Sequence, residues 1–189
     1  MVLHTFTQIH CHVRNFRYVS AVRRHCIKEE GGKQMKTKRA NIEQEVLRDF
    51  IKIAEENENN YVTGQGNNNR IMLEGNLYFQ FGDLRVVTSS SHVVIEVESA
   101  GGVTNLVKYW YCLKKGKIPN PNRIVLLHIF NTSSESDYGS HLLLWNYLWE
   151  MMKKDLGNCM EARLFKVGKG EELPDALAYF KKAILGEIK

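Results

Sequence analysis

The strongest constraint on the fold is a strand–helix–strand unit in the middle of the chain. Residues 92–98 alternate apolar and polar side chains like a strand, and residues 123–130 (RIVLLHIF) read as a strand that is buried on both faces. Between them, residues 103–115 repeat apolar side chains at helical spacing: Val103, Leu106, Val107, Trp110 and Leu113. A crossover of this kind is right-handed and places its strands parallel in one sheet. The sequence therefore predicts an α/β fold.

Three elements are expected before this unit. Residues 41–58 carry Ile42, Val46, Phe50 and Ile53 at helical spacing, with Asn41 as the expected N-cap. Residues 70–81 and 83–88 alternate well enough to be strands. The asparagine-rich stretch 57–69 is expected to be a mobile loop between the helix and the first strand.

Three elements are expected after it. Residues 139–155 form a helix that is apolar around nearly its whole circumference, residues 161–167 a last strand, and residues 173–185 a helix that begins near Pro174. The apolar helix is too short to span a bilayer. Burial in the core would explain it, and so would contact with a second subunit in a homodimer.

Acidic side chains gather on two neighbouring strands of this plan. The period of two in residues 92–98 puts Glu96 and Glu98 on one face, and Asp83 opens the strand before. Carboxylates roughly 6.5 Å apart along a strand repel one another unless a cation holds them together. Oxygen ligands of this kind suit Mg²⁺ or Mn²⁺, whose other positions go to water and phosphate. The pattern favours a phosphodiester hydrolase, and an ordinary hydrophilic strand face in an unrelated α/β protein is the alternative.

The acidic pattern resembles the motif of the PD-(D/E)XK nuclease superfamily. The first acid matches Asp83, and the second acid, the variable residue and the motif lysine match Glu96, Val97 and Glu98. Glu98 thus stands where the family usually has lysine, and Gly82 where it often has proline. The resemblance covers residues 41–130. It implies a restriction-endonuclease-like αβββαβ core, with a central mixed sheet flanked by helices, to which this chain makes C-terminal additions.

The resemblance also implies an activity. It predicts a nuclease dependent on Mg²⁺ or Mn²⁺ that acts on DNA, with Asp83, Glu96 and Glu98 as metal ligands and catalytic residues. Lys108 is the nearest downstream lysine that could replace the missing one, although an exposed helical lysine is usually only solvated. Glu45 could add an outer-shell carboxylate, as the family sometimes does, although an exposed, solvated helical glutamate is the more usual interpretation. The main alternative is a non-catalytic DNA-binding or assembly module of the same fold, which the missing lysine favours.

Four residues are candidate nucleic-acid contacts. Gly101 and Gly102 precede a helix N-terminus, where free N–H groups attract phosphate, and a tight strand-to-helix turn explains them equally well. Asn105 and Tyr109 lie on one helix face and resemble the Gln-x-x-x-Tyr pair of some exonuclease branches of the superfamily.

Composition bounds the remaining expectations. The chain has 189 residues, of which 43% are hydrophobic, enough for one domain with a core, and its net charge of +5 suits a polyanionic partner. Residues 1–34 are expected to be a basic N-terminal extension, either disordered or upstream of a natural start at Met35, and residues 35–189 the nuclease domain. We expect no secretory signal, no organic cofactor and no membrane contact, and a cytoplasmic location.

Overall fold

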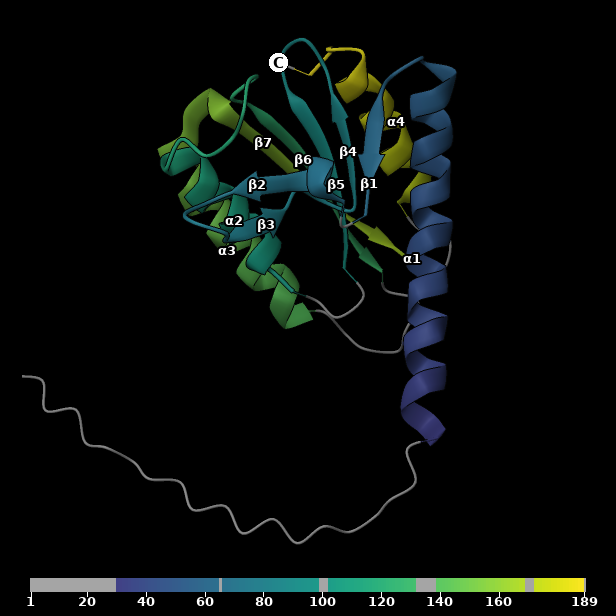
Figure 1. The fold of residues 1–189 in the computed structure, drawn as a ribbon. Helices are drawn as coiled ribbons and strands as arrows, with labels where there is room; N and C mark the ends of the chain where they lie inside the picture. Colours follow the sequence, from purple (N-terminus) through teal and green to yellow (C-terminus); the bar gives the residue numbers. More distant parts are fainter. Residues whose placement is uncertain (1–29, 65, 99–101, 132–138, 169–171, 189) are drawn as a thin grey trace, which may run out of the picture.

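The structure is a computed structural model that describes residues 30–64, 66–98, 102–131, 139–168 and 172–188; for residues 30–42 and 131 it describes the backbone alone. Its centre is a five-stranded sheet in the order β1–β4–β5–β6–β7 (Figure 1). The strands are β1 Tyr61–Thr63, β4 Leu84–Val87, β5 His92–Glu98, β6 Ile124–Asn131 and β7 Met160–Val167. Neighbours pair antiparallel from β1 to β5 and parallel from β5 to β7. The predicted α/β class, with a mixed sheet, is confirmed.

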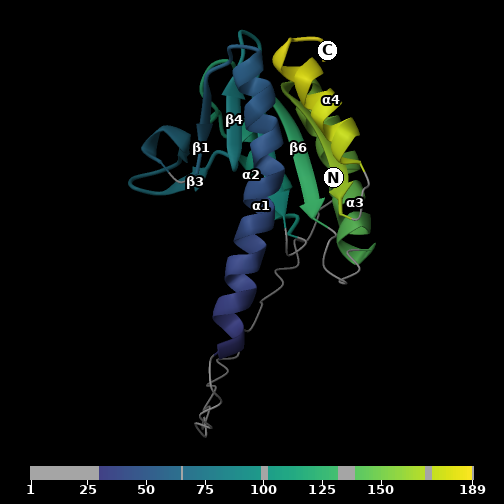
Figure 2. The same cartoon turned by 90° about the vertical axis from the view of Figure 1, so that its right-hand side faces the viewer.

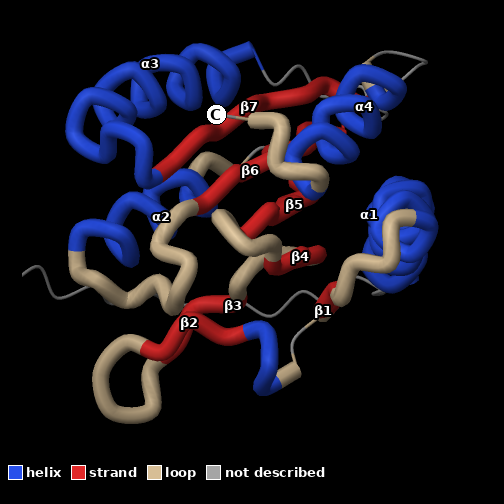
Figure 3. The backbone as a smooth tube through the Cα atoms, turned by 90° about the horizontal axis from the view of Figure 1, so that it is seen from above, coloured by secondary structure: helices blue, strands red, loops and turns tan. Residues whose placement is uncertain are grey.

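Two helices cover each face of the sheet. The long helix α1 Glu30–Glu56 and α4 Leu173–Ile184 lie on one face, and α2 Thr104–Lys114 and α3 Gly139–Leu156 on the other (Figure 3). A hydrophobic core lies on each face of the sheet, and alternate residues of β5 belong to different cores. Val93 and Ile95 pack with α1 and α4, whereas Val94 packs with α2 and α3. The N-terminal half of α1 extends past the end of the sheet (Figure 2).

The first helix is longer than the sequence predicts. It begins at Glu30 rather than at residue 41, so Asn41 lies inside the helix and is not its N-cap. No proline interrupts residues 30–56, and most residues between 33 and 40 are good helix formers. The predicted stripe is confirmed where side chains are described, because Val46 and Phe50 are buried.

The expected strand over residues 70–81 is instead a hairpin outside the main sheet. It consists of β2 Arg70–Met72 and β3 Tyr78–Gln80, which pair antiparallel with each other. Gly75 adopts φ +57° in the turn between them, a conformation that suits glycine. The first strand of the sheet is β1, which lies in the stretch predicted to be a loop, as does the short 3₁₀ helix η1 Asn67–Asn69.

The second helix has the predicted length but a different buried face. Leu106 and Leu113 are buried as expected, whereas Val107 is 38% exposed and Tyr109 takes a fully buried place on the sheet side. β6, β7 and α4 match their predicted ranges closely, and the predicted parallel pairing of β5 with β6 is confirmed. Within the described ranges, no helix is long and apolar enough to span a membrane.

Candidate functional site

Asp83 is fixed against β5 by its backbone and its side chain. Its N–H donates to the carbonyl of Ile95 (2.9 Å), and its Oδ2 accepts a hydrogen bond from the N–H of Val97 (2.8 Å). These two partners are the residues on either side of Glu96. The antiparallel pairing of β4 with β5 therefore brings the first two acids of the predicted motif together.

Gly82 is required at the position where the family motif often has proline. Its φ of +87° is closed to proline, whose ring fixes φ near −65°. A Cβ at this position would also lie 2.4 Å from Cγ1 of Val94. The departure from the motif therefore has a local structural cause: the chain passes so close to β5 that only glycine fits.

A buried asparagine ties the neighbourhood of Asp83 together. Asn69 is fully buried, and its Nδ2 donates to the carbonyls of Gly64 (2.9 Å) and Gly82 (2.8 Å). Gln80 Nε2 donates to the same Gly82 carbonyl (2.9 Å) and lies 3.5 Å from Asp83 Oδ1. Neither Asn69 nor Gln80 stands out in the sequence, because the first lies in the asparagine-rich stretch and the second in an expected strand.

The surroundings of Asp83 disfavour its charged form. Burial, followed by the negative charge of Glu96, raises the pKa of Asp83 to about 7, and Glu43 adds to the effect. The hydrogen bond from Val97 and the positive charge of Lys108 act in the opposite direction. Near neutral pH the site therefore exchanges a proton at Asp83, and a bound cation would favour the carboxylate.

Glu96 is a buried acid held by two side chains of α2. It is 4% exposed, and its Oε1 accepts hydrogen bonds from Lys108 Nζ and Tyr109 OH, both at 2.5 Å. Lys108 Nζ also donates to Asn105 Oδ1 (3.3 Å). The lysine considered as a replacement for the motif lysine is thus brought from the helix to the second acid of the motif, and it is not an exposed, solvated residue.

The position of Tyr109 does not allow the contact with nucleic acid that the sequence predicts. It is fully buried, and burial together with the charge of Glu96 raises the pKa of its hydroxyl well above the usual value. The hydroxyl therefore stays protonated and donates to Glu96. Tyr109 orients the acid rather than touching a ligand, whereas Asn105 is half-buried and contacts Lys108.

Glu98 does not complete a metal centre with the other two predicted ligands. Its carboxylate lies against Gly102, just before α2: Oε2 is 2.9 Å from where a Cβ on Gly102 would stand. Among the described residues no group of three or more acidic, histidine or cysteine side chains could hold a metal ion. The expected grouping of Asp83, Glu96 and Glu98 is therefore not found. Gly101 lies outside the described residues.

The glutamate of α1 that acts on Asp83 is Glu43, which the sequence pattern did not single out, and Glu45 matches the alternative of an exposed, solvated residue. Glu45 is exposed, whereas Glu43 is half-buried and acts on the pKa of Asp83. Glu43 lies three and seven residues before the buried Val46 and Phe50, so helical spacing alone could have placed it on the inner face.

A histidine next to Glu96 in the sheet was also missed. His128 is paired with Glu96 across β5 and β6 and is fully buried. Burial lowers the pKa of His128 to about 3, and its Nδ1 accepts a hydrogen bond from Trp145 Nε1 (3.0 Å). The imidazole is therefore neutral, and it adds no charge behind the site.

The pair of Asp83 and Glu96 fits a metal ion of limited demands. Mg²⁺ commonly binds proteins through one or two carboxylates and completes its shell with water and substrate phosphate. Burial raises the pKa of Asp83 most, and the negative charge of Glu96 adds to it; a divalent cation would offset both. Among the described residues the three-carboxylate centre predicted from the sequence is not found.

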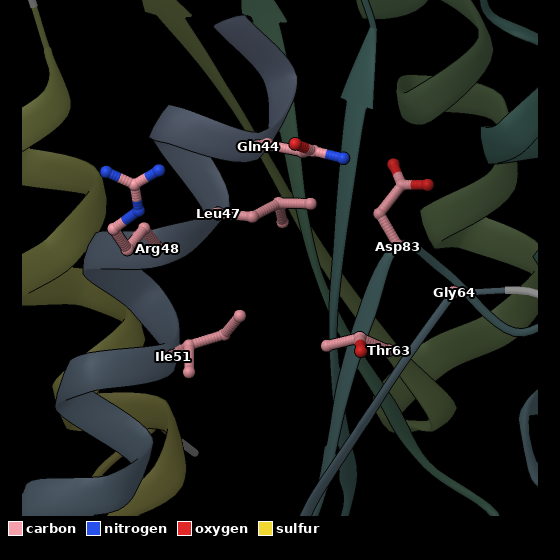
Figure 4. A pocket seen from close by; sticks show the side chains of 7 residues that line it. All are labelled: Gln44, Leu47, Arg48, Ile51, Thr63, Gly64 and Asp83. Atoms are coloured by element: carbon pink, nitrogen blue, oxygen red, sulfur yellow. The ribbon is translucent and has the colours of Figure 1, made fainter. Parts of the chain in front are cut away.

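A cavity opens from Asp83 toward α1. Its volume is about 420 Å³, and in Figure 4 Gln44 and Leu47 extend from α1 toward the wall that carries Asp83 and Thr63. The residues that line it are Gln44, Leu47, Arg48, Ile51, Thr63, Gly64 and Asp83.

Comparison of the chain with protein-family models, with curated proteins and with solved structures finds no match.

Proposed function

We propose that this protein is a metal-dependent nuclease that hydrolyses phosphodiester bonds in DNA. The observation that carries the proposal is the cluster of Asp83, Glu96 and Lys108, in which two acids and one lysine meet at the point where β4 and β5 pair. Metal-dependent hydrolysis of a phosphodiester uses a divalent cation and positive charge near the phosphate, and this cluster has candidate residues for both.

The order of the elements supports the resemblance to the PD-(D/E)XK superfamily. Helix α1 is followed by the antiparallel strands β1, β4 and β5, then by α2 and by β6, which is parallel to β5. This is the αβββαβ order of the restriction-endonuclease-like core, with the hairpin β2–β3 inserted between the first two strands. The motif lysine would come from α2 instead of β5.

Each residue of the cluster has a distinct part in the proposed reaction. Asp83 and Glu96 would hold the cation, which when bound would supply Lewis-acid stabilisation of charge on the phosphate. Lys108 would hold a second positive charge beside Glu96 and bind the phosphate oxygen. Tyr109 and Asn105 keep Glu96 and Lys108 in place, since neither of those two charges can be buried without partners.

A direct assay tests this proposal. Purified protein should nick plasmid DNA or degrade end-labelled linear DNA with Mg²⁺ or Mn²⁺, and not in EDTA. Asp83→Ala and Glu96→Ala should abolish cleavage, whereas Glu45→Ala, which removes an exposed glutamate of α1, should leave it unchanged. Full activity in both site variants would refute the proposal.

The lysine has its own matched comparison. Lys108→Met keeps the unbranched stem of the side chain and removes the ammonium group, and it should lower the cleavage rate by about a hundredfold. Lys115→Met changes an exposed lysine directly after α2, the helix that carries Lys108, and should have no effect on the cleavage rate.

A second candidate is a non-catalytic DNA-binding or assembly module. The observation in its favour is that Lys108 already neutralises Glu96 without a metal. In such a module Mn²⁺ would not bind, so the melting temperature would not change. A nuclease should instead gain about 2.7 kcal/mol at a Mn²⁺ concentration one hundred times its Kd.

A further inference from the structure

We infer that the cavity between α1 and β1 binds the base of an unpaired nucleotide next to the reacting phosphate. This inference rests on the proposed nuclease function and deepens it, because it makes single-stranded nucleic acid, or the unpaired end of a duplex, the substrate.

The position of the cavity is the first argument. Asp83 belongs both to the wall of the cavity and to the proposed cation site. A substrate whose phosphate lies at Asp83 would therefore have a neighbouring nucleoside at the mouth of this cavity. Helix α1 forms the opposite wall, so the ligand would lie between α1 and the segments that carry Thr63 and Asp83 (Figure 4).

The second argument is size. A volume of about 420 Å³ lies at the low end of the ~300–1,000 Å³ typical of pockets for small organic ligands. It accommodates a single nucleotide unit but not a base pair with both of its strands. A base can enter only after it has left the duplex stack, or if it was never paired.

The third argument is the chemistry of the walls. Leu47 and Ile51 present aliphatic surface, against which the flat face of a base can pack. Gln44 extends toward Asp83 in Figure 4, and its amide offers both a donor and an acceptor to the polar edge of a base. Arg48 is exposed on the same helix with its guanidinium directed away from Asp83, where the next phosphate along a strand would pass.

Surface residues of α1 supply clean variants. Gln44 and Glu45 are adjacent and both exposed, but only Gln44 lines the cavity. Gln44→Trp should fill the cavity mouth, while Glu45→Trp adds the same bulk elsewhere. Arg48 and Lys52 are likewise both exposed and one turn apart, and only Arg48 lines the cavity. Arg48→Ala and Lys52→Ala therefore form a second matched pair.

The experiment is fluorescence anisotropy of the full chain with a labelled oligodeoxynucleotide, single-stranded or as a blunt duplex, and with Ca²⁺ as the divalent ion. The single strand should bind about tenfold more tightly than the duplex. Gln44→Trp should lose about tenfold in affinity for the single strand, and Arg48→Ala a smaller factor, with both control variants unchanged.

The outcomes separate the inference from the proposed function. Equal affinity for the two DNA forms, or a Gln44→Trp variant that binds the single strand like the wild type, would overturn the base pocket even if metal-dependent cleavage is observed. A protein that neither binds nor cleaves DNA would overturn both. Loss of binding in Gln44→Trp alone, with an unchanged melting temperature, supports the pocket independently of turnover.

Discussion

At the scale of single residues, the site depends on contacts that join segments distant in the sequence. Asp83 reaches its place because Gly82 permits a close approach to β5 and because Asn69 links Gly82 to Gly64. Burial at this place, followed by the negative charge of Glu96, raises the pKa of Asp83. Substitutions of Asp83 and Asn69 should therefore have predictable effects on stability.

Asp83→Asn should change how stability depends on pH. An aspartate whose pKa is near 7 when folded and about 3.9 when unfolded binds more protons in the folded state between these values, so the wild type loses stability as pH rises from about 4 to 7. Asparagine does not titrate. The free energy of unfolding of the variant minus that of the wild type should therefore be about 1–3 kcal/mol higher above pH 7 in EDTA than at pH 4.

Urea unfolding at several pH values measures this difference, and Asp49→Asn, at an exposed site on α1, is the control. Mn²⁺ should restore the wild type at high pH but not the Asp83→Asn variant. Curves that stay parallel from pH 4 to pH 8 would contradict the electrostatic account of the site.

Asn69→Ala should destabilise the protein by about 2 kcal/mol, because the carbonyls of Gly64 and Gly82 lose a shared buried donor. Asn68→Ala is the matched control, since Asn68 is exposed and contributes its backbone carbonyl to a hydrogen bond with Arg85. Thermal unfolding compares the two variants. An equal loss in both would show that the asparagine-rich stretch matters as a whole and not through this buried amide.

At the scale of elements, α2 combines packing with the chemistry of the site. Its inner face places Tyr109 and Lys108 on Glu96, while Trp110 and Lys114 on its outer side bond to Asp155 of α3. The helix is therefore fixed from both sides. A change on its inner face should affect the geometry of Glu96 before it affects the fold.

Tyr109→Phe tests this positioning role. Removal of the hydroxyl takes one of the two α2 donors from Oε1 of buried Glu96 and should cost about 1 kcal/mol of stability. If the proposed function holds, cleavage should fall more than binding, because the buried Tyr109 is out of reach of DNA whereas Glu96 would hold the cation. Tyr111→Phe, at a 41% exposed position on the same helix, is the control. Unchanged kcat with a lower melting temperature would make the role of Tyr109 purely structural.

The elements also show what the sequence can and cannot predict. Long periodic segments such as α1, β5, β6 and α4 follow from apolar spacing, because each buries one stripe or both faces. β1 has only three residues, Tyr61–Thr63, and is a strand because β4 pairs with it, a tertiary cause that local pattern does not report. The buried face of α2 was misread because the period counts only apolar residues, whereas Tyr109 is buried together with its hydrogen bond to Glu96.

At the scale of the whole molecule, the outer face formed by α2 and α3 exposes more large apolar side chains than the face formed by α1 and α4, among the residues whose side chains the structure describes. In the core beneath α1 and α4, the rings of Phe50 and Phe180 pack edge to face, with their centroids 5.3 Å apart. On the opposite face, α3 buries Trp145 and Met152 yet leaves a row of large apolar side chains in solvent. These are Leu143 (74% exposed), Leu144 (46%), Tyr147 (63%) and Met151 (49%).

This row of exposed apolar side chains is the surface through which the predicted homodimer would form, and it can be tested. Leu143 and Tyr147 are four residues apart and therefore adjacent on one face of α3, where burial against a second copy would remove apolar surface from water. Sedimentation of the wild type should show a dimer at high concentration, and Leu143→Glu with Tyr147→Glu should give a monomer. Lys52→Glu changes the net charge by the same two units on α1 and should leave the dimer intact, so a loss in both cases would indicate general electrostatic repulsion. A wild type that remains monomeric at every concentration would instead mean that this row does not join two copies.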